Sequence, residues 1–240
     1  LLDWLATEYP RREWSLKAMH RLIMNSVAYK QSGVVSERFR KLDPENELFS
    51  RMPLQKLDAE ALRDSMLFVS NQLNEQGRGG KPDPVKSHKD GLVSIPRGPD
   101  GWRRSLYVQL RRTQIPTIFA TFDLPRMEPN CTDRPQSTVV PQALHLLNDA
   151  TVHQIAGHFA GRLMKERSGL DAQLARAHRL AFSRSASMDE LELVKKFLKK
   201  LKTRWKVELA GKGSEKMIHR HALTNYCRVL FNASEFHYVD

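Results

Sequence analysis

The stretch SMDELELVKKFLKKLKTRWK, residues 187–206, indicates most directly how this chain folds. It opens with Ser187 and places Glu190 three residues later, which is the capping-box pattern that begins a helix. An apolar residue then recurs every three or four positions, at Leu191, Val194, Leu198, Leu201 and Trp205. Lysines cover the other faces. The stretch therefore predicts a long helix with a narrow buried stripe and a strongly basic exposed surface.

The same apolar spacing recurs on both sides of this stretch and predicts further helices. Pro116 and Pro141 stand where a proline suits the start of a helix, and Asp58 is placed to cap another. The predicted helices cover Trp14–Lys30, Leu57–Leu73, Pro116–Phe122, a segment opened by Pro141, Thr151–Lys165, Asp171–Phe182 and Glu215–Phe231.

Residues 75–102 interrupt the helical pattern with glycine, proline, lysine and aspartate, which predicts a long loop. A short strand at Leu92–Ile95 and a second at Ser105–Leu110 would form a small hairpin across it. Strands do not alternate with helices, so a parallel sheet has no basis. The expected fold is mainly α, an irregular multi-helix bundle with at most a small β-hairpin, forming a single domain over residues 1–240.

Composition limits the classes of protein to consider. Hydrophobic residues make up 40% of the 240 and charged residues 28%, which excludes global disorder. No stretch approaches the roughly 20 apolar residues of a membrane-spanning helix. The formal net charge of +12 favours an anionic partner. Cys131 and Cys227 lie far apart in no metal-ligand spacing, and both a disulfide and two buried thiols remain open.

The sequence predicts no metal site and no cofactor held by this chain. Nine histidines occur, but no pair has a spacing that suits a metal, and Cys-x-x-Cys-His for covalent haem is missing. Hydrolase and phosphate-loop signatures are missing too. Whether the chain is an enzyme stays open at this point.

The segment GWRRSLYVQLRR, residues 101–112, concentrates arginines. Arg103, Arg104 and Arg111 flank Tyr107, and planar guanidinium groups suit carboxylates, sulfates and phosphates. The cluster would make an anion clamp. The alternative is that these arginines neutralise acidic residues within the domain, such as Glu60 and Asp64.

A second polar segment, NCTDRPQSTVVPQ, leads into the helix opened by Pro141. Free N–H groups and the helix dipole favour an anion at such a start. The candidate ligand-binding residues here are Asn130, Arg134, Ser137 and Gln142. The structural alternative is that Ser137 or Thr138 caps the helix and Asn130 braces a turn.

The lysine-rich helix has two interpretations as well. Lysine is a common way to keep a surface helix soluble, so a solvated face is one of them. The absence of interleaved aromatic residues that could stack on bases favours this interpretation. Binding of a polyanion is the other, with an anionic polysaccharide ranked before nucleic acid.

Nine segments, taken in order, resemble one known family. The chain is similar to the C-terminal domain of planctomycete-type cytochrome c-containing proteins, catalogued as domain of unknown function fifteen fifty-three. The resemblance extends from Leu1 to Asp240 and rests on LLDWLATEY, WSLKAMHRLIMNSVAYKQS, DPENELFSRM, KLDAEALRDSML, RRSLYVQLRR, FATFDLP, NCTDRPQSTVVPQALHLLN, AHRLAFSRSASMDELE and LFNASEFHYVD.

The resemblance implies a C-terminal module of a longer exported protein, outside the cytoplasm, with a c-type haem in an upstream domain. The upstream domains of the same polypeptide are then its expected partners, and a role in polysaccharide-related redox chemistry follows. The function expected from resemblance and residues together is a helical module that contributes an anion- or sugar-binding pocket. The competing expectation is a non-enzymatic scaffold that binds polyanions through its lysine-rich helix.

Overall fold

The computed structural model describes residues 1–76, 79–99, 101–125, 134, 136–209 and 213–239. The chain divides into two compact units, one formed by residues 1–55 with 238–240 and the other by residues 56–237. The fold is mainly α-helical, as predicted, and the described strands are only two residues long. Among the helices of the described residues, none combines the length and apolarity needed to cross a bilayer.

The first unit consists of three helices joined by turns: α1 (Leu2–Arg11), α2 (Leu16–Met24) and α3 (Glu37–Leu42). It has almost no interior of its own. Of its described residues, only Met19 and Asp43 are buried. Large apolar side chains such as Trp14 and Leu48 are 66% and 77% exposed.

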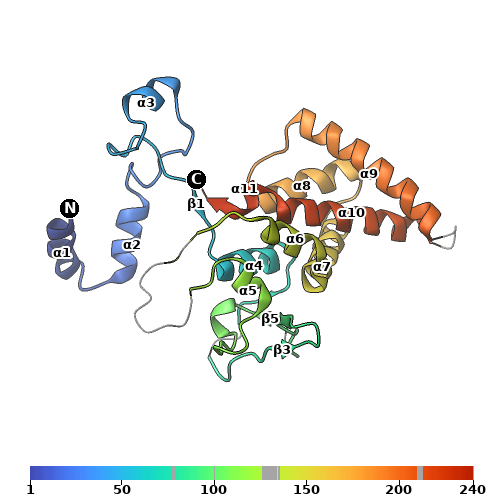
Figure 1. Cartoon of the computed structure of the whole chain (residues 1–240). Coiled ribbons are helices and arrows are strands. Elements are labelled where there is room, and N and C mark those ends of the chain that lie inside the picture. The colour runs from blue at the N-terminus through green and yellow to red at the C-terminus, as the bar shows by residue number, and fades with distance from the viewer. Residues whose placement is uncertain (77–78, 100, 126–133, 135, 210–212, 240) are drawn as a thin grey trace. The chain divides into compact units, whose positions relative to one another are not determined.

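The second unit holds the hydrophobic core, which centres on the packing of two long helices against each other. These are α7 (Ala150–Glu166) and α10 (Glu215–Asn232), whose Phe159 and Phe231 rings stack 5.8 Å apart. The remaining helices surround this pair, and Figure 1 shows α9 alongside α10. They are α4 (Ala59–Val69), α5 (Thr117–Thr121), α6 (Val140–Asn148), α8 (Leu170–Phe182), α9 (Met188–Glu208) and α11 (Ser234–His237).

Three pairs of short strands complete the described structure. β3 (Lys86–Ser87) and β4 (Val93–Ser94) form an antiparallel hairpin, which confirms the strand predicted around Leu92–Ile95. β2 (Leu73–Asn74) runs parallel to β5 (Trp102–Arg103). β1 (Gln55–Lys56) pairs with β6 (Tyr238–Val239).

Three local predictions were wrong. α2 ends at Met24 rather than Lys30, where the Asn25 side chain donates to the Arg21 carbonyl at 2.8 Å. Asp58 precedes α4 without capping it through its side chain. The expected strand at Ser105–Leu110 begins instead with a 3₁₀ helix, η1 (Ser105–Tyr107).

Cys227 lies on α10 as a buried free cysteine. Burial raises the pKa of its thiol well above the ordinary value. Cys131, the other possible member of a disulfide, lies outside the described residues.

Candidate functional site

Asp64 on α4 organises the first group of predicted site residues. Its Oδ1 accepts hydrogen bonds from the Ser105 backbone N at 2.8 Å and from the Ser105 hydroxyl at 2.7 Å. Arg104 reaches the other carboxylate oxygen with its Nε at 3.4 Å, and its side chain stays 59% exposed. Asp64 therefore fixes the turn that starts η1. It is also one of the internal carboxylates predicted as partners for the arginines of residues 101–112, and it pairs with Arg104.

Arg103 is held within the fold by four hydrogen bonds to three acceptor atoms. Its guanidinium donates to Asp83 Oδ1 at 2.6 and 2.9 Å and to the carbonyls of Gly79 and Lys81 at 2.6 Å each. The same group lies 4.9 Å from the centre of the Tyr107 ring. Asp83 raises the pKa of Arg103 through the hydrogen bonds it accepts. Arg103 thus braces the loop between β2 and β3, and Tyr107 packs against the same guanidinium.

Arg134 forms a fork with Glu60 at the start of α4. The two guanidinium nitrogens lie 3.0 and 3.1 Å from the two carboxylate oxygens, and Asp58 stands 3.3 Å away. These carboxylates raise the pKa of Arg134. For Glu60, burial is the largest single influence and raises the pKa, but the hydrogen bonds from Arg134, a backbone hydrogen bond and the charge of Arg134 together lower the pKa overall. Arg134 is partnered by the protein itself.

Ser137 and Gln142 belong to a fourth group, built around Asp123 and a buried lysine. Ser137 donates to Asp123 through its backbone N at 2.8 Å and its hydroxyl at 2.7 Å. Lys56 donates to Gln142 Oε1 at 2.8 Å and to the Ser137 carbonyl, and its side chain is only 5% exposed. Ser137 therefore does not cap α6, whose N-cap is Val139 without a side-chain bond.

The predicted residues consequently occupy separate groups instead of one shared pocket. Arg111 is exposed, and its Nε and Nη2 donate to the Gln109 side-chain oxygen at 3.2 and 3.0 Å. Asn130 lies outside the described residues. The other eight predicted residues belong to four groups, which centre on the carboxylates of Asp64, Asp83, Glu60 and Asp123. Each of these carboxylates already accepts hydrogen bonds from a cation or another donor of the protein.

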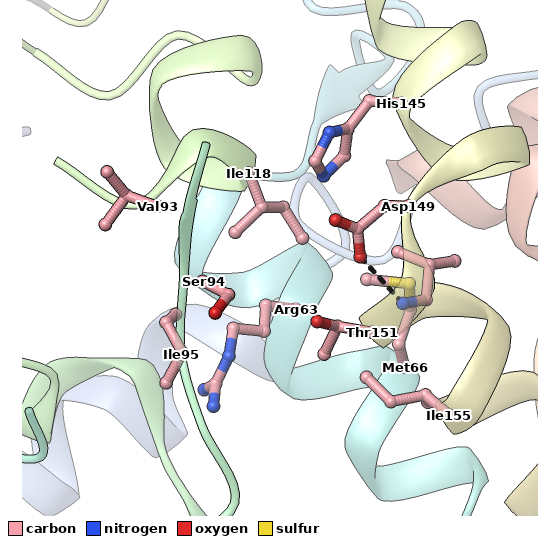
Figure 2. Close-up of a pocket in the computed structure, with 11 residues that line it drawn as sticks. Arg63, Met66, Val93, Ser94, Ile95, Ile118, His145, Asp149, Thr151 and Ile155 are labelled. Atoms are coloured by element: carbon pink, nitrogen blue, oxygen red, sulfur yellow. Dashed lines mark hydrogen bonds between the residues drawn. The ribbon is translucent and has the colours of Figure 1, made fainter. Parts of the chain in front are cut away.

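A small cavity lies between α4, β4 and the junction of α6 with α7 (Figure 2). Its volume of about 30 Å³ suits little more than a water molecule. Within the described structure, Arg63 Nη2 and His145 Nε2 are buried without a hydrogen-bond partner, and both residues line this cavity. Burial lowers the pKa of Arg63 to about 10, so it stays protonated at neutral pH. Burial also lowers the pKa of His145.

A larger hollow is lined mainly by carboxamides. The sequence patterns described above do not predict it. It measures about 600 Å³, is open to solvent, and follows β2 and the start of β5. We call it the amide hollow. Its lining residues are Asn71, Gln72, Leu73, Asn74, Gln76, Arg97 and Gly101. The run NQLNEQ at residues 71–76, with four amides in six positions, is the signal that could have revealed it.

Two features shape the amide hollow. Asn71 has a φ of 57°, a left-handed conformation that asparagine tolerates better than most residues, and it turns the chain from α4 into β2. Gly101 has a φ of 102° and brings its backbone next to the Gln72 carbonyl, which a Cβ would meet at 3.7 Å. Arg97 is exposed, with its guanidinium 5.8 Å from the Trp102 ring.

The surface of α9 is the other chemically distinctive feature. From Lys195 to Lys206 the helix carries seven cations and no acid. Four of these seven pair with acids, for example Lys195 with Asp171 at 2.8 Å. In the described part of the chain, Lys199, Lys200 and Lys202 form no ion pair.

The described residues contain no group of three or more His, Cys, Asp or Glu side chains that could hold a metal ion.

Comparison with known protein families gives a match. Neither the curated proteins nor the solved structures contain a match to this chain. The model of one protein family matches residues 1–198, which is most of the chain. This chain belongs to that family, PSD1, described as "Protein of unknown function (DUF1553)".

Proposed function

We propose that this chain is a helical binding module of an extracytoplasmic, cytochrome c-associated protein, and that it holds an acidic saccharide in the amide hollow. The observation that carries the proposal is the lining of that hollow by Asn71, Gln72, Gln76 and Arg97. Its volume of about 600 Å³ lies within the range of about 300 to 1,000 Å³ found for ligand sites.

The lining suits a ligand that is rich in hydroxyl groups and carries negative charge. Each carboxamide offers an acceptor oxygen and two N–H donors, so neighbouring amides can bind neighbouring hydroxyls of a sugar ring. Arg97 adds the one cation of the described lining. Its planar fork suits a carboxylate or a sulfate ester. An acidic saccharide combines both features.

The family resemblance supports the wider context of this proposal. Proteins of the type that this chain resembles typically carry an export signal and often a c-type cytochrome domain upstream, so the module would work outside the cytoplasm beside a redox centre. Contact with upstream domains would cover exposed apolar side chains of the first unit, such as Trp14 and Leu48. Haem staining of the intact polypeptide after cell fractionation tests both cofactor and location.

Calorimetric titration with uronic-acid oligosaccharides tests the amide hollow itself. We expect binding by the unmodified chain, and a loss of affinity of about tenfold or more in Arg97→Gln, because a charge-assisted hydrogen bond disappears. Gln76→Ala should weaken acidic and neutral oligosaccharides alike. Arg97→Gln should weaken only the acidic ones.

Arg112→Gln and Gln154→Ala provide matched controls, because both residues are exposed and neither lines the hollow. They should leave the affinity unchanged. Equal losses in controls and hollow variants would contradict the proposal, as would binding that none of the four substitutions alters.

A second candidate function is favoured by the unpaired lysines of α9. On this proposal the chain is a non-enzymatic scaffold that binds polyanions through Lys199, Lys200 and Lys202 together with the paired cations beside them. Binding of a sulfated polysaccharide such as heparin should weaken steeply as salt rises, since counterions are released. A flat salt dependence would exclude it.

A further inference from the structure

The outward surface of α9 combines cations with exposed apolar side chains. Leu193 and Val207 are 70% and 75% exposed, and Phe197 is 36% exposed. At 100° per residue they share one side of the helix with Lys196, Lys200 and Arg204. We call these six residues the outer face of α9.

The opposite side of α9 is already occupied by the core of the second unit. Leu198 is buried, and the Trp205 ring stacks on His221 of α10 with centroids 4.5 Å apart. Because these contacts fix how the helix is rotated, the apolar residues of the outer face are left outside the fold. The inward side is therefore already covered. The outer face exposes apolar side chains, which do not contribute to solubility as its lysines and arginine do.

We infer that the outer face of α9 docks on an anionic lipid surface. This inference rests on the second candidate function, binding of polyanions by α9, and names its partner. A helix that lies in a membrane interface places Leu and Phe among the lipid chains while lysines and arginines meet anionic headgroups. A soluble polyanion would use the cations of this face and leave the apolar residues without a role.

Charge complementarity separates a lipid surface from a second copy of the chain. Two outer faces brought together would place Lys196, Lys200 and Arg204 opposite the same cations, and like charges repel. Only Lys196 and Arg204 have acidic partners, at 3.9 and 2.7 Å, both within α9. Lys200 has no ion pair in the described structure. An anionic surface would neutralise all three cations of the outer face.

Co-sedimentation with vesicles tests the inference on the whole chain. Vesicles of phosphatidylcholine mixed with phosphatidylglycerol should bind the chain, and vesicles of phosphatidylcholine alone should not. Replacing Lys196 and Lys200 with Gln should lower vesicle affinity by on the order of tenfold or more. Replacing Leu193 and Phe197 with Ser should lower vesicle affinity as well, while leaving heparin binding unchanged.

The pair Lys165→Gln and Arg179→Gln is the matched control, since both residues are exposed, unpaired in the described structure, and lie on α7 and α8. These substitutions should change neither the affinity for vesicles nor the affinity for heparin. Binding of heparin without anionic vesicles would overturn the lipid inference and leave the polyanion proposal standing. Binding of neither ligand would overturn both. Self-association in sedimentation that Leu193→Ser and Phe197→Ser abolish would identify a second copy as the partner and overturn the inference.

Discussion

At the scale of single residues, Arg184 is the most heavily bonded cation of the second unit. It donates to both oxygens of Glu190 at 2.7 and 2.9 Å and to both oxygens of Glu235 at 2.6 and 2.8 Å. Glu190 also closes the capping box of α9 by accepting from the Ser187 backbone N at 2.7 Å. Arg184 thereby ties the start of α9 to α11.

The pKa of Glu190 predicts how this cluster responds to acid. Hydrogen bonds from Arg184 lower its pKa to about 2 from the ordinary 4.5. A lowered folded-state pKa stabilises the fold above pH 4.5, and that stabilisation is lost as the pH falls toward 2. Glu190→Gln should therefore reduce the free energy of unfolding near neutral pH, and the difference from the unmodified chain should shrink below pH 4.5. Urea denaturation at a series of pH values measures this.

Glu192→Gln is the control for that prediction. Glu192 lies on the same helix, is 70% exposed, and reaches Lys196 only at 3.9 Å. Its loss should have little effect on stability at any of these pH values. A difference between Glu190→Gln and the unmodified chain that stays constant from neutral pH to pH 2 would contradict the account.

Residue types in the sequence indicate which side chains form ion pairs and hydrogen bonds, but they do not identify the partners. The sequence predicts that the arginines of residues 101–112 bind an anion or an internal carboxylate such as Asp64. It does not indicate Asp83 as the partner of Arg103, because Asp83 lies in a loop whose path no periodic pattern describes. The amides of residues 71–76 do not stand out as a site, since a run of polar side chains after a helix is also typical of an ordinary turn.

At the scale of secondary-structure elements, α7 and α10 pack against each other in the core of the second unit. Leu223 on α10 is fully buried in the core of the second unit, whereas Val229 on the same helix is 47% exposed. Leu223→Ala should lower the free energy of unfolding by about 2 to 5 kcal/mol, because it removes buried methyl groups and leaves a cavity. Chemical denaturation monitored by circular dichroism measures the loss.

Val229→Ala shortens a side chain on the same helix without opening the core. It should change stability by no more than about 0.5 kcal/mol. Similar losses for the two variants would mean that α10 is not packed as described.

Elements with strong periodicity and explicit caps were predictable from the sequence. The capping box of α9 forms as expected, with Ser187 and Glu190 bonded reciprocally. α7 and α10 begin and end within one residue of their predicted bounds. The region from Ser105 onward was not predictable, because Asp64 on α4 decides its backbone, and that contact joins residues 41 positions apart. Weak alternation along SLYVQL could not outweigh it.

At the scale of the whole molecule, the two units differ in how much apolar surface they bury. Met19 and Asp43 are the buried residues among those described in the first unit, whereas the second unit contains the core. Segments with few buried contacts open locally at low free-energy cost. Backbone amides of α2 should therefore exchange with deuterium much faster than those of α7. Exchange followed by mass spectrometry measures both helices in one experiment.

α9 serves as the internal reference in that experiment. It is largely exposed too, but Leu198 and Trp205 anchor it to the second unit. Its amides near Leu198 should exchange more slowly than those of α2. Protection of α2 equal to that of α7 in the isolated chain would contradict the account, since it would require a buried core that the first unit lacks.

The central claim is that the amide hollow binds an acidic saccharide, and nuclear magnetic resonance of the chain titrated with a uronic-acid oligosaccharide tests it most directly. The side-chain amide signals of Asn71, Gln72 and Gln76 should shift in proportion to occupancy, while that of the exposed Gln154 stays in place. Shifts confined to α9, or no shift at all at saturating ligand, would contradict the claim.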